Sequence, residues 1–420
     1  MSDPIKIRHF TDALKIPDIR FFIGATAFFT LASRALAVVI GFQIYKITHS
    51  ALALGWLGLI EAIPAISLVL FGGYVADHFN RRKILLITRA ASCVCAIVLA
   101  FLSYKNYSST VAGLYAVVFL AGVARGFADP ANTAFEAQIV PKHLTVNAAS
   151  WISSTWISCA IIGPAIIGFV FDAAGAVGSY LVITGCFIVS WLFTMVISPK
   201  PKPVQEKSES VLKSMIVGWQ YVFKDETLVG AMALDLFAVL FGGAVALLPI
   251  YAEDILHVGA KGLGFLNAAP AIGALIISLI ATRHPPIAKA GRNLLLAVMG
   301  FGLCILVFAF SKNFFLSMAA LFFSGVFDGI SVVIRRSMVR LLSPDHLRGR
   351  IAAASWIFIC ASNELGAFES GILASWIGAV PCVAVGGFVT LGIVALTATF
   401  AKKLKNLSFD VHTLEHKKFD

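Results

Sequence analysis

Twelve apolar segments, each about 19 to 27 residues long, alternate with short polar segments along the chain. An α-helix of about 20 apolar residues crosses the hydrocarbon core of a bilayer, and inside that core only helices and closed barrels satisfy their backbone polar groups. The apolar runs are continuous and do not alternate with polar residues, which excludes a membrane β-barrel. The sequence therefore predicts an all-α, polytopic membrane protein with 12 transmembrane helices. The predicted spans are 19–45, 51–76, 84–103, 110–136, 148–171, 177–197, 228–252, 260–282, 293–311, 314–338, 350–375 and 379–400.

Composition excludes the other common classes. The chain of 420 residues is 59% hydrophobic and only 13% charged, whereas a soluble domain carries about 25% charged residues. A soluble enzyme, a disordered chain and a coiled coil are all excluded. The seven cysteines lie within apolar runs without metal-ligand spacing, and the chain shows neither a phosphate-binding Gly-rich loop nor a nucleophile elbow. We therefore expect no metal, no cofactor and no enzymatic activity.

The basic residues predict the orientation of the spans. With the N-terminus inside, 26 of the 33 Lys and Arg residues lie on the inner side and four on the outer side. Arg335 and Arg336 are counted on the inner side. This asymmetry follows the positive-inside rule and predicts that both termini are cytoplasmic. It also explains the net charge of +11 without a nucleic-acid partner.

The longest polar stretch, 198–227, divides the spans into two groups of six. Within it, 208–223 has the apolar spacing of an amphipathic helix at the membrane surface. We predict an N-terminal six-helix bundle, a cytoplasmic linker, a C-terminal six-helix bundle and a cytoplasmic tail. Their ranges are 1–197, 198–227, 228–400 and 401–420.

The two halves resemble each other at an offset of about 203 to 206 residues. One of several matches in register pairs Leu57-Gly58, Ala62 and Pro64-Ala-Ile66 with Leu263-Gly264, Ala268 and Pro270-Ala-Ile272. Because each repeat has six spans, both halves have the same orientation in the membrane. The sequence therefore predicts two parallel six-helix repeats around a central cavity that opens to each side in turn.

The loop after the second span carries a distinctive motif. It reads GGYVADHFNRRK over 72–83, and Gly73, Asp77, Arg81 and Arg82 match the signature loop GxxxDRxGRR of the major facilitator superfamily, which the chain therefore resembles. The resemblance implies that Asp77 faces the N-terminus of the eleventh span and latches the two halves together on the inner side. His78 and Asn80 replace the usual Arg and Gly.

Two further motifs indicate a branch of this superfamily. Gly163, Pro164 and Gly168 in the fifth span resemble a motif of its exporters, although close helix packing explains such small residues equally well. The run SNELGAFESG over 362–371 is similar to a stretch in the branch that holds the bacterial enterobactin exporter and drug:proton antiporters.

The resemblance implies an inner-membrane exporter of a siderophore or an amphipathic drug-like compound, coupled to protons and monomeric. A transport-inactive sensor or scaffold on the same fold is the alternative of another class, and an uptake carrier is the alternative within transport. Sequence physics does not separate uptake from export.

Ionisable residues inside spans are costly and are functional candidates by default. We predict that Arg34, Glu61, Arg125, Asp235, Asp328, Asn363 and Glu364 line the substrate cavity. Burial disfavours the charged form of a carboxylate, so the candidates for proton coupling are Asp129, Asp328, Glu364 and Glu369.

Several of these side chains have two possible roles. Arg125 and Asp129 are four residues apart and either neutralise each other or separate during transport. Arg34 either binds an anionic group of the substrate or pairs with Glu61 or another span. We expect Arg89 to reach the membrane surface and Leu99 to face lipid.

Overall fold

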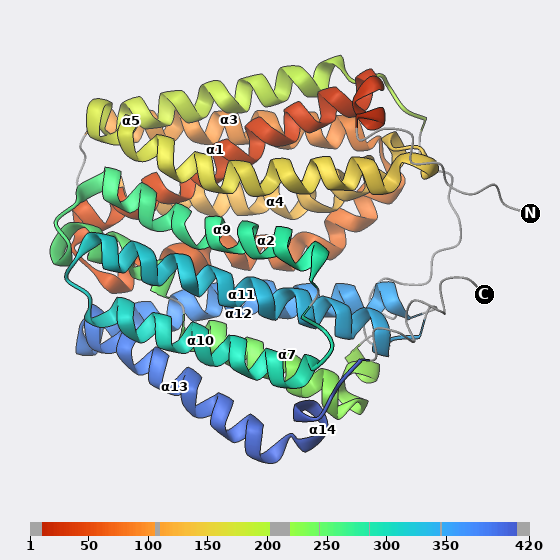
Figure 1. Cartoon of the computed structure of the whole chain (residues 1–420). Coiled ribbons are helices and arrows are strands. Elements are labelled where there is room, and N and C mark those ends of the chain that lie inside the picture. Colours follow the sequence, from red (N-terminus) through yellow and green to blue (C-terminus); the bar gives the residue numbers. More distant parts are fainter. Residues whose placement is uncertain are drawn as a thin grey trace, which may run out of the picture. The chain divides into compact units, whose positions relative to one another are not determined.

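The computed structural model describes residues 11–105, 110–201, 219–242, 244–284, 286–344 and 347–409, without the side chains of 105, 110, 348–350 and 352–361. It is all-α, with no strand in these ranges. The chain forms two compact units (Figure 1). Unit 1 holds residues 1–47 and 60–208, and unit 2 holds residues 48–59 and 209–420. The predicted domain boundaries remain predictions, and the predicted linker helix lies outside the described residues up to position 218.

The spans of unit 1 belong to five long helices. They are α1 (Pro17–Thr48), α2 (Ala51–His78), α3 (Arg81–Lys105), α4 (Thr110–Ile139) and α5 (Thr145–Val196). Gly175, at φ 64°, interrupts α5 in a backbone region that favours glycine. Figure 1 shows the two arms of α5 folding back on each other at one end. These arms correspond to the predicted fifth and sixth spans.

The first helix of unit 2 after the first part of α2 belongs to a broken span. α7 (Glu226–Phe241) is followed by a 3₁₀ turn (Ala244–Leu247), the short α8 (Leu248–Ile250) and a π turn (Tyr251–Ile255). The sequence predicted one continuous segment over 228–252. Glycine has low helix propensity and proline lacks a backbone N–H, so Gly242 and Pro249 account for the irregular stretch.

The remaining helices of unit 2 are regular. They are α9 (Gly259–Arg283), α10 (Ala290–Phe310), α11 (Phe314–Leu342), α12 (Arg348–Ile377), α13 (Ala379–Phe400) and the short α14 (Lys402–Lys405). Ten helical segments among the searched residues are long and apolar enough to cross a membrane. One of them is the α5 segment that Gly175 divides, and α12 adds a further helix of 30 residues. The predicted twelve spans and all-α class are thus confirmed.

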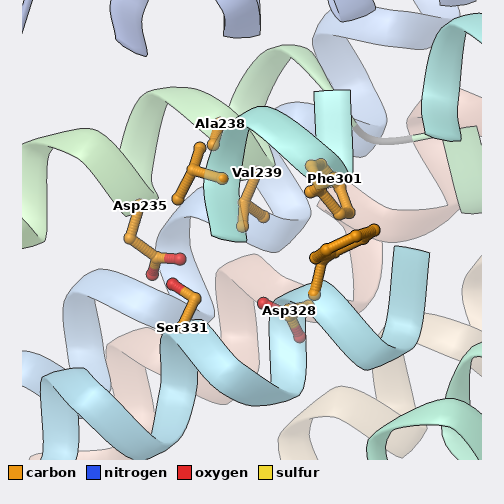
Figure 2. Close-up of a pocket in the computed structure, with 8 residues that line it drawn as sticks. Asp235, Ala238, Val239, Phe301, Asp328 and Ser331 are labelled. Carbon is orange, nitrogen blue, oxygen red and sulfur yellow. The ribbon is translucent and has the colours of Figure 1, made fainter. Parts of the chain in front are cut away.

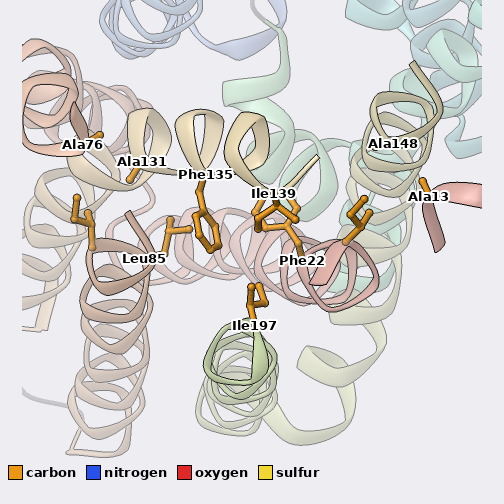
Figure 3. Packing of buried hydrophobic residues seen from close by; sticks show 11 residues of the cluster. Ala13, Phe22, Ala76, Leu85, Ala131, Phe135, Ile139, Ala148 and Ile197 are labelled. Carbon is orange, nitrogen blue, oxygen red and sulfur yellow. The ribbon is translucent and has the colours of Figure 1, made fainter. Parts of the chain in front are cut away.

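Unit 1 has an apolar core at the end that carries the signature loop (Figure 3). Phe22 of α1 and Phe135 of α4 meet edge to face with ring centroids 6.0 Å apart. Ile197, after α5, and Leu85 of α3 pack into the same cluster. The ends of five helices are therefore fixed around the loop.

Leu99 corrects one expectation. Its side chain is 1% exposed inside unit 1, whereas Ile97 on the same helix is 51% exposed. The prediction that Leu99 faces lipid was wrong, because both helix faces are apolar and hydrophobicity does not tell them apart.

Glycines allow equivalent helices to touch in both units. A Cβ at Gly122 of α4 would lie 2.4 Å from the carbonyl oxygen of Glu61 and 2.8 Å from Pro64 of α2. A Cβ at Gly325 of α11 would lie 2.0 Å from the carbonyl oxygen of Pro270 on α9. Gly122 and Gly325 are 203 residues apart, and Pro64 and Pro270 are 206 apart. In each unit a glycine at the repeat offset therefore packs closely against the helix that carries the equivalent proline, although the nearest carbonyl belongs to Glu61 in unit 1 and to Pro270 in unit 2.

Substitution of Gly325 by Ala tests this contact. Because the neighbouring atom is backbone, we expect Gly325→Ala to lower the free energy of unfolding by about 1–3 kcal/mol. Gly392→Ala on α13 is the matched control, since its Cβ would meet nothing within 4 Å. It should leave stability unchanged or raise it by up to about 1 kcal/mol. Denaturant unfolding in detergent measures both, and equal stability of the two variants would contradict the close contact.

Candidate functional site

Unit 1 contains a charged cluster on α2 and α4. Arg125 Nη1 lies 2.9 Å from Glu61 Oε1, and Arg125 Nε lies 3.4 Å from Asp129 Oδ2. Gly122 and Gly126 flank Arg125 on α4 and bring that helix against α2 beside Glu61. All three side chains keep substantial exposure, at 46% for Arg125, 37% for Glu61 and 62% for Asp129. The cluster therefore lies on an accessible face of unit 1.

Arg34 lies in the middle of α1 and is exposed within the chain. Its guanidinium carbon is 4.8 Å from the ring centroid of Trp156 on α5, a cation–π contact. Gly163 brings the two helices together, since a Cβ there would lie 2.9 Å from the carbonyl oxygen of Leu31. Pro164 and Gly168 are buried in the same arm of α5. Sequence reasoning missed Trp156, whose signal is its place seven residues before Gly163 on the same helix.

The signature loop caps helix ends within unit 1. Arg81 donates to the carbonyl oxygens of Ala76 at 3.0 Å and Ala134 at 3.1 Å. Arg82 donates to the carbonyl oxygen of Thr194 at 3.2 Å and to that of Met195, both in the last turn of α5. Ala76, Thr194 and Met195 lie in last turns, where the carbonyls have no partner in the helix and carry partial negative charge, so arginines suit these positions. Ala134 lies one turn further inside α4.

Asp77 forms a longer and more exposed contact than the hydrogen bonds that Arg81 and Arg82 make. Its Oδ1 lies 3.6 Å from Arg81 Nη2, and the side chain is 53% exposed. A Cβ at Gly73 would meet no described atom within 4 Å. Both residues therefore present an open surface next to the loop, and the proposed contact of Asp77 with the eleventh span remains a prediction.

Arg89 does not reach the membrane surface as expected. It is 3% exposed and donates to the carbonyl oxygen of Ser190 at 3.3 Å and to the Thr194 hydroxyl. The Phe29 ring centroid lies 5.6 Å from its guanidinium carbon. The prediction was wrong because Arg89 binds the end of α5 from inside the bundle, next to the carbonyls that Arg82 caps.

Unit 2 contains a second and more deeply buried cluster. Arg335 of α11 forms an ion pair with Asp235 of α7, and its Nη2 lies 3.8 Å from Asp328 Oδ1. The side chains of Arg335 and Asp235 are 12% and 9% exposed, while that of Asp328 is 46% exposed. Figure 2 shows Asp235 and Asp328 at a small pocket with Ser331 and Phe301. The structure thus brings together two of the predicted cavity residues and adds an arginine.

Arg335 was counted with the basic residues of the inner side, although it falls within the predicted span 314–338. It lies within α11, seven residues and two helical turns after Asp328, so both occupy one helix face. Because Arg335 was used only to predict the orientation of the spans, its spacing from Asp328 was overlooked. Ser331, three residues after Asp328, was missed because a serine in an apolar span carries no distinctive signal.

The remaining predicted site residues lie on α12, which corresponds to the predicted eleventh span. In unit 2, a Cβ at Gly58 would lie 3.0 Å from Glu364 Oε2, so this carboxylate lies against the first part of α2. Asn363 is exposed, and Glu369 is partly buried. Among the described residues, no group of three or more His, Cys, Asp or Glu is arranged to hold a metal ion.

The two clusters present charged side chains from α2 and α4 in unit 1 and from α7 and α11 in unit 2. A single model of the Major Facilitator Superfamily matches residues 22–367, so the chain belongs to that superfamily. It is a secondary transporter for a small-molecule substrate and a multi-pass inner-membrane protein.

The chain is also similar to individual members of the superfamily. The chain is 26% identical over 368 residues to the enterobactin exporter EntS of Shigella boydii serotype 18, with 86% of each protein covered. It is equally similar to the enterobactin exporter EntS of Escherichia coli O139:H28. Among solved structures, a POT family transporter in complex with 5-aminolevulinic acid is similar with a TM-score of 0.74 and 11% identity, covering 92% of this chain and 96% of that one. The nucleoside transporter NupG is similar with a TM-score of 0.71 and 12% identity, covering 92% of this chain and 100% of that one.

The two clusters should differ in their effect on stability. Arg335→Ala leaves the buried carboxylate of Asp235 without its charged partner, which should lower the free energy of unfolding by about 3–5 kcal/mol. Arg125→Ala removes an exposed ion pair and should cost about 1 kcal/mol or less. Denaturant unfolding in detergent compares them. A cost as small for Arg335→Ala as for Arg125→Ala would contradict the burial of the unit 2 cluster.

Proposed function

We propose that this transporter exports a siderophore or a similar amphipathic compound by alternating access and exchanges it for protons. In this proposal it acts as a monomer with both termini in the cytoplasm. The two proposed halves are 1–197 and 228–400, and 198–227 and 401–420 are the proposed linker and tail.

The observation that carries the proposal is the set of exposed charges in the middle of the helices of unit 1. Arg34, Glu61, Arg125 and Asp129 come from α1, α2 and α4 and stay accessible within the chain. Charged groups facing acyl chains are strongly unfavourable, so such a face belongs on a water-filled path. A transport-inactive scaffold has no need to maintain four charges at this depth.

The side chains around Arg34 favour an aromatic anion as substrate. A guanidinium forms paired hydrogen bonds with planar oxygen pairs, and an indole offers a surface for ring stacking. Arg34 and Trp156 present both groups together. A catecholate siderophore combines an aromatic ring with adjacent oxygens, and EntS, the relative named above, is an enterobactin exporter.

Proton exchange is proposed at carboxylates next to these charges. Asp129 is the first candidate, because Arg125 contacts both it and Glu61. Arg125 can pair with either carboxylate. Protonation of Asp129 removes its negative charge, so the arginine moves toward Glu61 and the net charge at the substrate site changes. Asp328, Glu364 and Glu369 are further candidates. Substrate contacts are proposed at Arg34, Glu61, Arg125, Asp235, Asp328, Asn363 and Glu364.

Transport in inverted membrane vesicles with an imposed proton gradient tests the function. We expect gradient-dependent uptake of a catecholate siderophore into the vesicles. Asp129→Asn should abolish the dependence on the gradient while substrate binding persists. Asp172→Asn, an exposed carboxylate elsewhere on α5, is the matched control and should transport normally. Full gradient-dependent transport by Asp129→Asn would remove this residue from the coupling.

Other outcomes of the same assay distinguish the alternatives. Accumulation in right-side-out vesicles, with none in inverted ones, would indicate an uptake carrier. A folded protein that binds the siderophore and transports nothing in either direction would indicate a sensor or a scaffold.

The latch role of the signature loop is a separate proposal. Asp77→Asn should lower the transport rate about fivefold or more without changing the unfolding temperature, because it removes a contact made in only one conformation. Asp12→Asn, which removes the ion pair of Asp12 with Lys15 outside the loop, should leave transport unchanged. Rates from vesicles and melting curves in detergent provide the comparison, and normal transport by Asp77→Asn would contradict the latch.

A further inference from the structure

The small pocket in unit 2 lies between α7, α10 and α11. Asp235, Asp328 and Ser331 supply its polar atoms, and the rest of its lining is apolar. In Figure 2 the carboxylate of Asp235 and the hydroxyl of Ser331 face each other, with Asp328 one turn away on the helix of Ser331. The pocket has room for a single particle of the size of a water molecule.

The state of the Ser331 hydroxyl points to a ligand. Its side chain is 3% exposed, and its Oγ is buried without a hydrogen-bond partner among the described residues. A buried hydroxyl left in this state costs free energy. Ser324, on the same helix and equally buried, donates to the carbonyl oxygen of Leu321 at 2.7 Å. Ser331 differs in that its hydroxyl lies at the pocket.

The charges around the pocket do not balance. Asp235 and Asp328 carry two negative charges, and Arg335 is the one arginine that pairs with both among the described residues. Arg336 is the next residue and acts on Arg335 electrostatically, but no ion pair joins it to either carboxylate in the described part of the chain. One further positive charge neutralises the cluster, whereas a divalent ion would leave an excess. Oxygen atoms of carboxylates and hydroxyls are the ligands that hard cations prefer.

We propose that Asp235, Asp328 and Ser331 bind one monovalent inorganic cation, for which sodium is the probe. The carboxylates supply the charge, and the Ser331 hydroxyl supplies a neutral oxygen ligand. Arg335 holds Asp235 in place and excludes a second cation. The cation site goes beyond the proposed exchange of substrate for protons, because it adds an ion and requires neither siderophore nor proton gradient.

Binding of radioactive sodium to the purified protein tests the proposal, with choline replacing sodium at constant ionic strength. The wild-type chain should bind sodium saturably, with about one ion per chain. Ser331→Ala should bind about tenfold more weakly, since it lacks one oxygen ligand. Ser324→Ala should bind as the wild type does. Asp328→Asn, which changes a half-exposed carboxylate, should abolish binding.

Melting curves accompany the binding measurements. Sodium should raise the unfolding temperature of the wild type and of Ser324→Ala above the value in choline, and it should not do so for Asp328→Asn. Absence of saturable sodium binding by the wild type overturns the proposal, and so does unaltered binding by Ser331→Ala. When the vesicle transport of the siderophore is run with choline in place of sodium, failure of the cation site and failure of the proposed function are separate results.

Discussion

The contact of a glycine with a backbone carbonyl of the neighbouring helix is the interaction on which the geometry of both units depends. Lipid chains are as apolar as leucine, so helices in a membrane associate through close packing and not through hydrophobic burial. Gly122 on α4 and Gly325 on α11 bring backbones to a distance that no other residue permits. Each contact fixes the helix that carries a charged residue one turn later, Arg125 in unit 1 and Asp328 in unit 2.

Equivalent positions of the two units carry opposite charge. Arg125 and Asp328 are 203 residues apart and each lies between two glycines. Arg125 has carboxylates around it on an accessible face, whereas Asp328 shares a buried arginine with Asp235. Exposed ion pairs exchange partners at small cost, and buried ones resist it. The first cluster is therefore suited to rearrangement and the second to a fixed geometry.

The sequence predicted the helical class, the number of spans and the repeat, because all three follow from long apolar runs and the spacing of small residues. It did not predict which face of a helix is buried, since the lipid and the core are both apolar, and Leu99 shows the result. Arg89 was expected to reach the membrane surface with its long side chain, and Arg335 was counted with the basic residues of the inner side, but each finds its partners inside its own unit. Ser331 and Trp156 belong to their clusters only because distant helices meet, which a single sequence does not record.

Asp18, at the start of α1, binds the segment that follows α5. It accepts a hydrogen bond from the backbone N–H of Ser198 at 3.0 Å and pairs with Lys200 at 2.7 Å. Ile197 joins Ile19 and Phe22 in the apolar core beside it. The first helix of unit 1 is thus completed by residues that leave the ribosome about 180 positions later. During synthesis these contacts of α1 cannot form until residues 197–200 have been made, so this end of the N-terminal unit is completed only after the sixth span.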